Sequence, residues 1–321
     1  KEQKLAYISL AMLGTGIVLT GFVETNLTFY LATIVMSIGF HYFETINGSL
    51  TLQWIDKDKT AEFLGRVIAT RSAASIIAFS FVWVLYQQFE LSYMWLYTLG
   101  GGVAVVIVFY CWQSFPLFPE KVTQTKKIIL RKRYWLYYAL QFMSGARRQI
   151  FVVFAGFLMV EKFEFTVAEI SMLLIANAAI NVVLAPKIGR LIQRFGERKS
   201  LIFEYIGLSL IFAGYAFVES SEFAVFLYIA DHLFFSIAIA MKTYFQKIAD
   251  TADIASSSGV SFTINHIAAV FIPVAFGLVW LYSPSLVFLA GSGMAIVSLI
   301  LALNMPSKPS LGNEVLLGKF S

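Results

Sequence analysis

Two adjacent arginines are the most unusual feature of this sequence. Arg147 and Arg148 lie in a long apolar stretch, 14 residues after Arg133 and 13 residues before Glu161. At about 1.5 Å of rise per residue, both lie near the mid-depth of a membrane-spanning helix. The planar, permanently charged guanidinium group suits a carboxylate or a phosphate. The competing interpretation is a buried arginine that pairs with an acidic residue and holds helices together.

Tyr137, Gln141, Ser144 and Arg148 recur at helical spacing and form one polar stripe. We therefore predict that Arg148 and Gln141 line a cavity and contact a substrate. Arg147 points about 100° away around the helix. For Arg147 we favour an ion pair with another helix.

Four ionisable side chains in other apolar stretches are candidate proton carriers: Asp231 with its neighbour His232, and His41 with Glu44. A carboxyl group in a membrane can take up and release a proton, because desolvation favours its neutral form. Histidine titrates near neutral pH by default. The alternative is structural, with Asp231 in an interhelical contact and Glu44 paired with a buried arginine such as Arg147.

Polar residues of two further stretches complete the predicted substrate site. Asn177 and Asn181 are four residues apart and share a helix face, and Asn265 and His266 lie about a third of the way into their helix. Such side chains often support helix packing instead, so both roles stay open for these four residues.

The composition indicates which elements hold these residues. Of 321 residues, 59% are hydrophobic and 13% are charged, with a mean hydropathy of +0.75, whereas soluble domains are about 25% charged. This composition excludes a typical soluble enzyme, a disordered chain and a nucleic-acid-binding module. The single cysteine, Cys111, excludes an internal disulfide and a Cys/His metal centre. Phosphate-binding loops, zinc-protease motifs and nucleophile elbows do not occur, so we predict neither an enzyme nor a cofactor.

Ten stretches are long and apolar enough to cross a bilayer, which requires about 20 residues. Short polar loops join them, so the sequence predicts an all-α membrane protein. The predicted spans are 5–22, 27–50, 67–87, 92–113, 134–160, 166–185, 201–218, 223–246, 258–281 and 285–305.

Lysine and arginine are concentrated on one side of these spans. Of 24 such residues, 19 lie in the loops 1–4, 53–66, 114–133, 186–200, 247–257 and 306–321, whereas the opposite loops contain Lys162 alone. Positive charge accumulates on the cytoplasmic side of membrane proteins. We predict an inner (plasma) membrane protein with both termini cytoplasmic. The net charge of +5 then reflects topology and not nucleic-acid binding.

The first four spans map onto the last four when the sequence is shifted by about 194 residues, and internal repeats are common in secondary transporters. Spans 134–160 and 166–185 have no counterpart in the first half. We therefore expect two further helices, about 60 residues, before Lys1; a true ten-span protein is the alternative. The predicted division is an N-terminal half (1–113, helices 3–6), a basic linker (114–133), a six-helix half (134–305, helices 7–12) and a tail (306–321).

Six plus six helices, a basic central loop and cytoplasmic termini resemble the major facilitator superfamily. The cytoplasmic signature of that family, Gly-x-Leu-x-Asp-Arg-x-Gly-Arg-Arg/Lys, is similar to residues 189–199, which the resemblance makes a conformational gating motif. The motif residues are Gly189, Arg190, Gln193, Arg194, Gly196 and Arg198. Gln193 stands in place of the usual aspartate, which puts the ion-pair latch of that aspartate in question. Glu204 could instead pair with Arg194 or Arg198.

The resemblance implies a secondary active transporter that works by alternating access around a site at mid-depth. With Arg148 in the cavity, we expect a monomer in the lipid bilayer that carries a small anionic organic molecule, coupled to protons. An exporter of hydrophobic compounds, a non-transporting membrane sensor, a channel and a uniporter without proton coupling are the alternatives.

Overall fold

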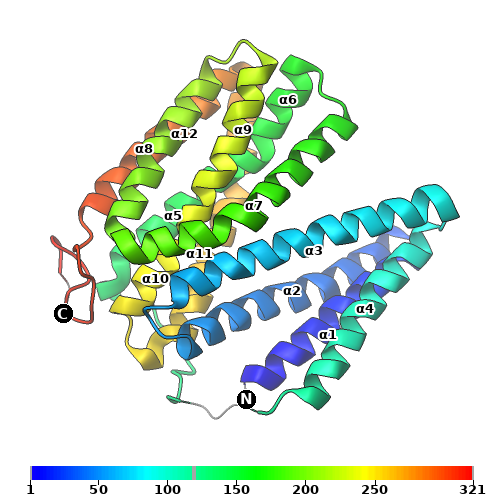
Figure 1. The fold of residues 1–321 in the computed structure, drawn as a ribbon, viewed down its shortest axis with the longest axis horizontal. Helices are drawn as coiled ribbons and strands as arrows, with labels where there is room; N and C mark the ends of the chain where they lie inside the picture. Colours follow the sequence, from blue (N-terminus) through cyan, green and yellow to red (C-terminus); the bar gives the residue numbers. More distant parts are fainter. Residues whose placement is uncertain (1, 118–120, 320–321) are drawn as a thin grey trace. The chain divides into compact units, whose positions relative to one another are not determined.

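The structure is a computed structural model that describes residues 2–117 and 121–319 (Figure 1). These residues are largely helical, and β-structure among them is limited to an isolated bridge between Ser310 and Asn313. The α-helices are α1 (Glu2–Thr20), α2 (Asn26–Trp54), α3 (Thr60–Phe89), α4 (Tyr93–Ser114), α5 (Trp135–Gln149), α6 (Gly156–Phe163), α7 (Val167–Phe195), α8 (Glu197–Ala216), α9 (Ser221–Phe235), α10 (Ile239–Ile248), α11 (Ile254–Tyr282) and α12 (Pro284–Leu303).

Ten helical segments of the described chain are long and apolar enough to cross a membrane. The all-α fold and the ten spans predicted from the sequence are thereby confirmed. Two spans are composite. The fifth joins the 3-10 turn η1 (Lys132–Tyr134), α5, the π-helical segment η2 (Ile150–Ala155) and α6. The eighth joins α9, the 3-10 turn η3 (Ser236–Ala238) and α10, and the 3-10 turn η4 (Thr251–Asp253) leads into α11.

Two of the predicted cytoplasmic loops are largely helical. Within 53–66, α3 already begins at Thr60, and within 186–200, α7 continues to Phe195 before α8 begins at Glu197. The loss of apolar residues marks the edge of the membrane, but a helix continues into water wherever its backbone stays hydrogen-bonded. Gly196 alone separates α7 from α8, and its φ of +84° is a conformation that favours glycine.

The structure divides into two compact units. The first is formed by the described residues of Lys1–Trp54 and Ile77–Thr125, and the second by those of Ile55–Ile76 and Lys126–Ser321. The predicted N-terminal half, 1–113, included residues 55–76, which pack here with the second unit. The start of α3 therefore belongs to the second unit, where Gly65 approaches Ala185 of α7.

Close glycine contacts hold the first unit together. A Cβ atom on Gly16 of α1 would collide with the backbone of Met36 on α2, and one on Gly101 of α4 would collide with the backbone of Gly14 on α1. The missing side chains let α1 approach both α2 and α4 closely.

The second unit repeats this arrangement. There α8 packs along α12 and beside α9, as α1 packs along α4 and α2. The helix starts correspond at intervals close to the predicted shift: Glu2 with Glu197, Asn26 with Ser221, Thr60 with Ile254 and Tyr93 with Pro284. The internal repeat in the sequence is therefore also a repeat of helix packing.

Candidate functional site

A buried group of charged residues lies inside the second unit. Arg147 on α5 is 1% exposed, and Glu204 on α8 and Asp231 on α9 are 0% exposed. Arg147 Nη2 lies 4.0 Å from Glu204 Oε1, and Arg147 Nη1 donates a hydrogen bond to Ser298 Oγ on α12. The guanidinium carbon lies 4.5 Å from the centre of the Tyr205 ring. One cation thus joins three helices, α5, α8 and α12.

The acids in this group outnumber the base. Asp231 interacts electrostatically with both Arg147 and Glu204. Within the described residues, no carboxylate oxygen of Asp231 or Glu204 accepts a hydrogen bond. Burying an uncompensated charge is costly, and a buried carboxylate commonly becomes neutral instead. The group is electrically neutral when one of its two carboxyl groups holds a proton, so this arrangement of residues can bind one.

Arg148 lies on a different side of α5 from Arg147. Its side chain is exposed, and its guanidinium carbon lies 5.7 Å from the centre of the Phe235 ring at the end of α9. It also interacts electrostatically with His232, one turn earlier on α9. His232 packs edge-on against Phe151, with ring centres 4.7 Å apart. The structure therefore brings together two predicted site residues, Arg148 and His232.

The polar stripe of α5 is split between two environments. Gln141 Nε2 donates to the Tyr137 hydroxyl at 3.0 Å, and that hydroxyl donates to Ser261 Oγ on α11 at 3.0 Å. Gln141, Tyr137 and Ser144 are all buried. Gly145 lies at the same contact between α5 and α11, because a Cβ atom there would collide with Asn265 of α11. Gln141 and Asn265 thus lie in the interface of α5 with α11, and only Arg148 of the predicted stripe is exposed.

The remaining predicted polar residues have varied surroundings. Asn181 Oδ1 accepts a hydrogen bond from Ser236 Oγ at 3.0 Å, whereas the amide of Asn177 is buried without a hydrogen-bond partner in the described structure. His266 is half-buried, with Nδ1 2.8 Å from the carbonyl oxygen of Phe262. Asn181 therefore contributes to the contact of α7 with η3, and η3 begins four residues after His232.

The second pair of predicted proton carriers lies in the first unit. His41 Nδ1 is 2.6 Å from the carbonyl oxygen of Ser37, and both His41 and Glu44 are half-buried on α2. Within the second unit, Arg147 contacts Glu204 and Ser298.

The gating motif forms a junction between α7 and the start of α3. A Cβ atom on Gly189 would collide with the carbonyl oxygen of Ala61, and one on Gly65 with that of Ala185. Gln193 Nε2 donates to the carbonyl oxygen of Asp58 at 2.6 Å. Gln193 thereby makes an uncharged hydrogen bond to the segment before α3, at the position where the family signature has an aspartate.

The other polar residues of the motif region are distributed differently from the prediction. Glu204 pairs with Arg147 and not with Arg194 or Arg198, because it lies two turns inside α8 and faces the interior. Arg198 donates instead to the carbonyl oxygen of Leu303 at 2.9 Å and to Ser307 Oγ at 3.3 Å. Arg190 and Arg194 are exposed.

Several contributors were not predicted from the sequence. Gln246 Nε2 on α10 donates to the carbonyl oxygen of Ile55 at 2.8 Å, so it contacts the segment before α3 three residues from the hydrogen bond of Gln193 to Asp58. Tyr205 and Ser298 surround Arg147. Tyr205 directly follows Glu204 in the sequence, which is a weak signal, whereas Ser298 is one of three serines in the apolar α12 and gives none.

The linker before α5 is anchored by an acidic residue at the start of α11. Buried Asp253 accepts hydrogen bonds from Arg131 Nε at 2.9 Å, from Arg131 Nη2 at 3.0 Å and from the Tyr134 hydroxyl at 3.3 Å. Arg133 Nη2 lies 3.8 Å from the same carboxylate. These hydrogen bonds raise the pKa of Arg131 above its usual value. The contacts fix the linker to the second unit.

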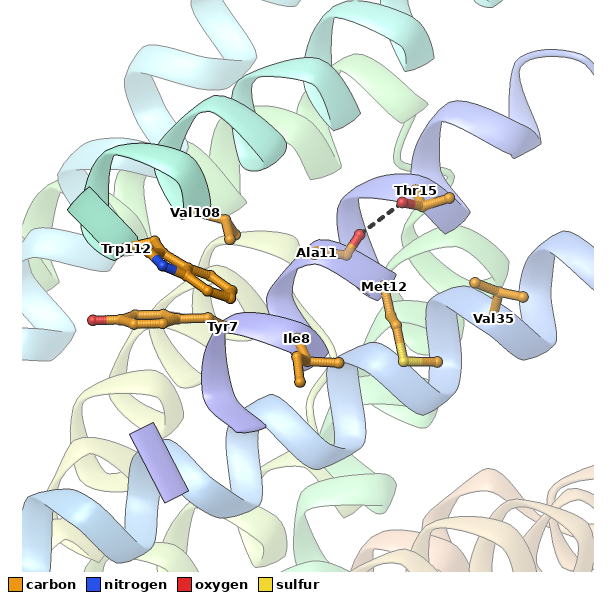
Figure 2. Close-up of a pocket in the computed structure, with 8 residues that line it drawn as sticks. All are labelled: Tyr7, Ile8, Ala11, Met12, Thr15, Val35, Val108 and Trp112. Atoms are coloured by element: carbon orange, nitrogen blue, oxygen red, sulfur yellow. Dashed lines mark hydrogen bonds between the residues drawn. The ribbon is translucent and has the colours of Figure 1, made fainter. Parts of the chain in front are cut away.

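A pocket of about 280 Å³ lies in the first unit, and none of the residues that line it is a predicted site residue (Figure 2). Tyr7 stacks on Trp112 at one end of it, with ring centres 6.5 Å apart. The Thr15 hydroxyl beside it donates to the carbonyl oxygen of Ala11 at 2.9 Å. With an apolar lining and its hydroxyl already bonded, the pocket does not suit a charged molecule.

Comparison with known proteins identifies the fold. The family model described as Major Facilitator Superfamily matches residues 3–273 and 137–315. The chain belongs to the Major Facilitator Superfamily. Its fold is that of transporters and not of enzymes, as predicted from the sequence. None of the curated proteins matches the chain in sequence.

Solved structures of this superfamily resemble the chain throughout its length. The E. coli fucose:proton symporter FucP is 14% identical, with a TM-score of 0.75 over 94% of this chain and 83% of FucP. The human organic anion transporter MFSD10 (TETRAN) is 11% identical, with a TM-score of 0.71 over 94% of this chain and 77% of its own. A bacterial homologue of the iron transporter ferroportin is 16% identical, with a TM-score of 0.69 over 94% and 81%.

Proposed function

We propose that this member of the superfamily is a proton-coupled carrier of a small anionic organic solute, which acts as a monomer by alternating access in an inner (plasma) membrane. The observation that carries the proposal is the exposure of Arg148 near the mid-depth of its span. A cation facing lipid at this depth costs about 3 kcal/mol even on the lenient insertion scales, so such residues face water, a partner or a substrate. A water-filled cavity lined by Arg148 would attract an anion.

Arg148 has the chemistry for anion recognition. Its guanidinium presents several donors in a planar fork that matches a carboxylate or a phosphate. Phe235 supports it at 5.7 Å, and His232 adds a second polar group on the neighbouring helix. An anion held between α5 and α9 would therefore contact two helices of the second unit.

The buried group of Arg147, Glu204 and Asp231 supports proton coupling. Its two acids and one base are neutral together only with one proton bound. Asp231 precedes His232 in the chain, so the proton-binding group and the proposed anion site are adjacent on α9. Loading of the proton and binding of the anion can thus influence each other through one helix.

Two of the structural relatives fit this proposal by their described activities. FucP is a fucose:proton symporter, and MFSD10 is an organic anion transporter. At these low sequence identities, the comparison shows a shared fold only. The proposal therefore rests on the chemistry of the site in this chain.

The test is transport by the full-length protein in proteoliposomes with an imposed proton gradient. A panel of small organic anions and hydrophobic cations is compared for the wild type, Arg148→Ala and Asp231→Asn. We expect gradient-driven anion uptake in the wild type, loss of anion binding in Arg148→Ala, and loss of gradient-driven uptake with retained anion counterflow in Asp231→Asn.

Other outcomes distinguish the alternatives. Export of hydrophobic cations that survives Arg148→Ala would make the chain an exporter and Arg148 structural. Binding without counterflow indicates a sensor, and current without saturation indicates a channel. Saturable anion transport that ignores the proton gradient in the wild type indicates a uniporter.

A further inference from the structure

We propose that the cytoplasmic end of α7 binds the anionic headgroup of a membrane phospholipid. Lys187, Arg190 and Arg194 lie on the last turns of this helix at spacings of three and four residues, so they share one face. All three side chains are exposed. This surface is separate from the proposed transport site, and the inference does not depend on the transported molecule.

The same face of α7 changes character along its length. Nearer the start of the helix it carries the exposed side chains of Met172, Ile175, Ala179 and Val183, all of which are apolar. An exposed, uniformly apolar stripe in a membrane span faces hydrocarbon, whereas the wall of a water-filled cavity would carry polar groups. The basic residues that continue this stripe therefore face the lipid side of α7.

The length of α7 places the basic residues at headgroup level. Its 29 residues extend to about 43 Å, whereas the hydrocarbon core of a bilayer is about 30 Å thick. Counting about 20 residues from Val167 at the outer end brings the helix to Pro186 at the inner boundary of the hydrocarbon core. Lys187 is the next residue, and the turns up to Arg194 lie among the headgroups.

Contacts beside this face hold it in position. Gly189 and Gln193 point toward the start of α3, where Gly189 meets Ala61 and Gln193 donates to the Asp58 carbonyl. Gln193 lies three residues after Arg190, so the contact with α3 borders the basic face and leaves its three cations exposed.

Two nearby acidic residues are engaged elsewhere. Glu62 pairs with Arg66 at 2.8 Å, and Glu197 pairs with Lys247 at 2.6 Å. In the part of the chain that the structure describes, no carboxylate forms an ion pair with any of the three basic residues of α7. Their charge is therefore available to an external anion.

A phospholipid matches both components of this surface. A phosphate group would lie among the three cations, and each basic residue near an anionic membrane surface adds to the attraction between protein and lipid. The exposed apolar side chains of Leu191 and Phe195 lie beside the cations and can contact the glycerol and upper acyl region. A free phosphate ion would use the cations but not these apolar neighbours.

The experiment measures lipid binding to the purified full-length protein by native mass spectrometry, with phosphatidylglycerol and phosphatidylcholine titrated separately. The wild type is expected to bind phosphatidylglycerol in preference to phosphatidylcholine. The variant K187Q/R190Q/R194Q is expected to lose this preference about tenfold. The control K199Q/K308Q/K319Q removes three exposed charges elsewhere and is expected to keep it.

Each remaining outcome decides the matter. Equal binding of the two lipids by the wild type, or an undiminished preference in the α7 variant, overturns the proposal. Displacement of phosphatidylglycerol by soluble glycerol phosphate at equal concentration would show a free-anion site instead. If the triple variant does not fold, R190Q alone is expected to reduce the preference severalfold, and K187R/R190K/R194K to retain it.

Discussion

Arg147 and Arg148 are neighbours in the chain, yet Arg147 is enclosed by Glu204 and Ser298 whereas Arg148 is exposed beside Phe235. Successive helical residues point about 100° apart, so one step along α5 moves a cation from the interior of the unit to its surface. We therefore expect substitutions at the two positions to affect different properties, stability at the first and the proposed anion binding at the second.

Arg148→Gln is expected to leave the protein as stable as the wild type, within about 0.5 kcal/mol, because the side chain is exposed and forms no ion pair with the residues that the structure describes. Its affinity for a small organic anion should fall at least about tenfold, the usual consequence of losing a charge-assisted contact. Thermal unfolding in detergent and anion counterflow measure the two effects. Lys199→Gln removes an exposed charge from α8 and serves as the control. A large loss of stability without loss of anion binding would contradict this role for Arg148.

The buried acids should respond non-additively to substitution. Glu204→Gln or Asp231→Asn alone leaves one carboxylate to balance Arg147, so each is expected to cost about 1 kcal/mol or less. The double variant leaves Arg147 buried without a counter-charge, and arginine cannot lose its proton. Its expected cost is about 3–5 kcal/mol, as found for broken buried pairs.

Adding Arg147→Met to the double variant provides the matched comparison. This triple variant has no charge left in the group, so much of the lost stability should return. Unfolding temperatures of the five proteins, measured together in one detergent, test the pattern. Strictly additive costs, or a triple variant less stable than the double one, would show that the three residues do not act as one group.

Gly189→Val is expected to separate α7 from α3. A Cβ atom at this position would collide with the carbonyl oxygen of Ala61, and overpacking of a tight helix contact costs about 1–3 kcal/mol. Crosslinking between cysteines placed at Asp58 and Gln193 should decrease, as should the unfolding temperature. Gly293→Val on α12, where nothing lies within 4 Å of an added Cβ, is the control and should change neither.

Asp253→Asn is expected to loosen the linker before α5. The substitution removes a carboxylate that accepts two hydrogen bonds from Arg131 and lies near Arg133. Hydrogen bonds to charged groups contribute about 1.5–3 kcal/mol. Trypsin should therefore cut faster after Lys127 and Arg131. Asp56→Asn removes only an exposed pair with Lys59 and should leave the cleavage rate unchanged.

The helices were predictable because the bilayer imposes a length and a polarity on each span. The predicted and observed spans agree in number, and the main differences lie at the ends predicted to be cytoplasmic, where polar residues continue α3 and α7 beyond the apolar stretch. Hydropathy reports where hydrocarbon ends, whereas the end of a helix depends on backbone conformation, as at Gly196.

The partners of the charged residues were less predictable. The sequence placed Arg147 and Arg148 at mid-depth, but the pairing of Arg147 with Glu204 depends on how α5 and α8 pack, and these positions are 57 residues apart in the chain. Helical spacing likewise grouped Gln141 with Arg148, but Gln141 is covered by α11 and Arg148 is not. Spacing within one helix does not show where a neighbouring helix covers it. Tertiary packing decided both cases.

The burial of Arg147 also has a consequence for how the protein is made. The counter-charges Glu204 and Asp231 are synthesised only after 57 and 84 further residues (from position 147 to positions 204 and 231), which takes several seconds at about 5–20 residues per second. During that interval α5 carries two arginines that lipid alone would not accept. We expect the fifth span to remain at the insertion machinery until α8 and α9 have emerged, so that the helices enter the bilayer as a group and not one by one.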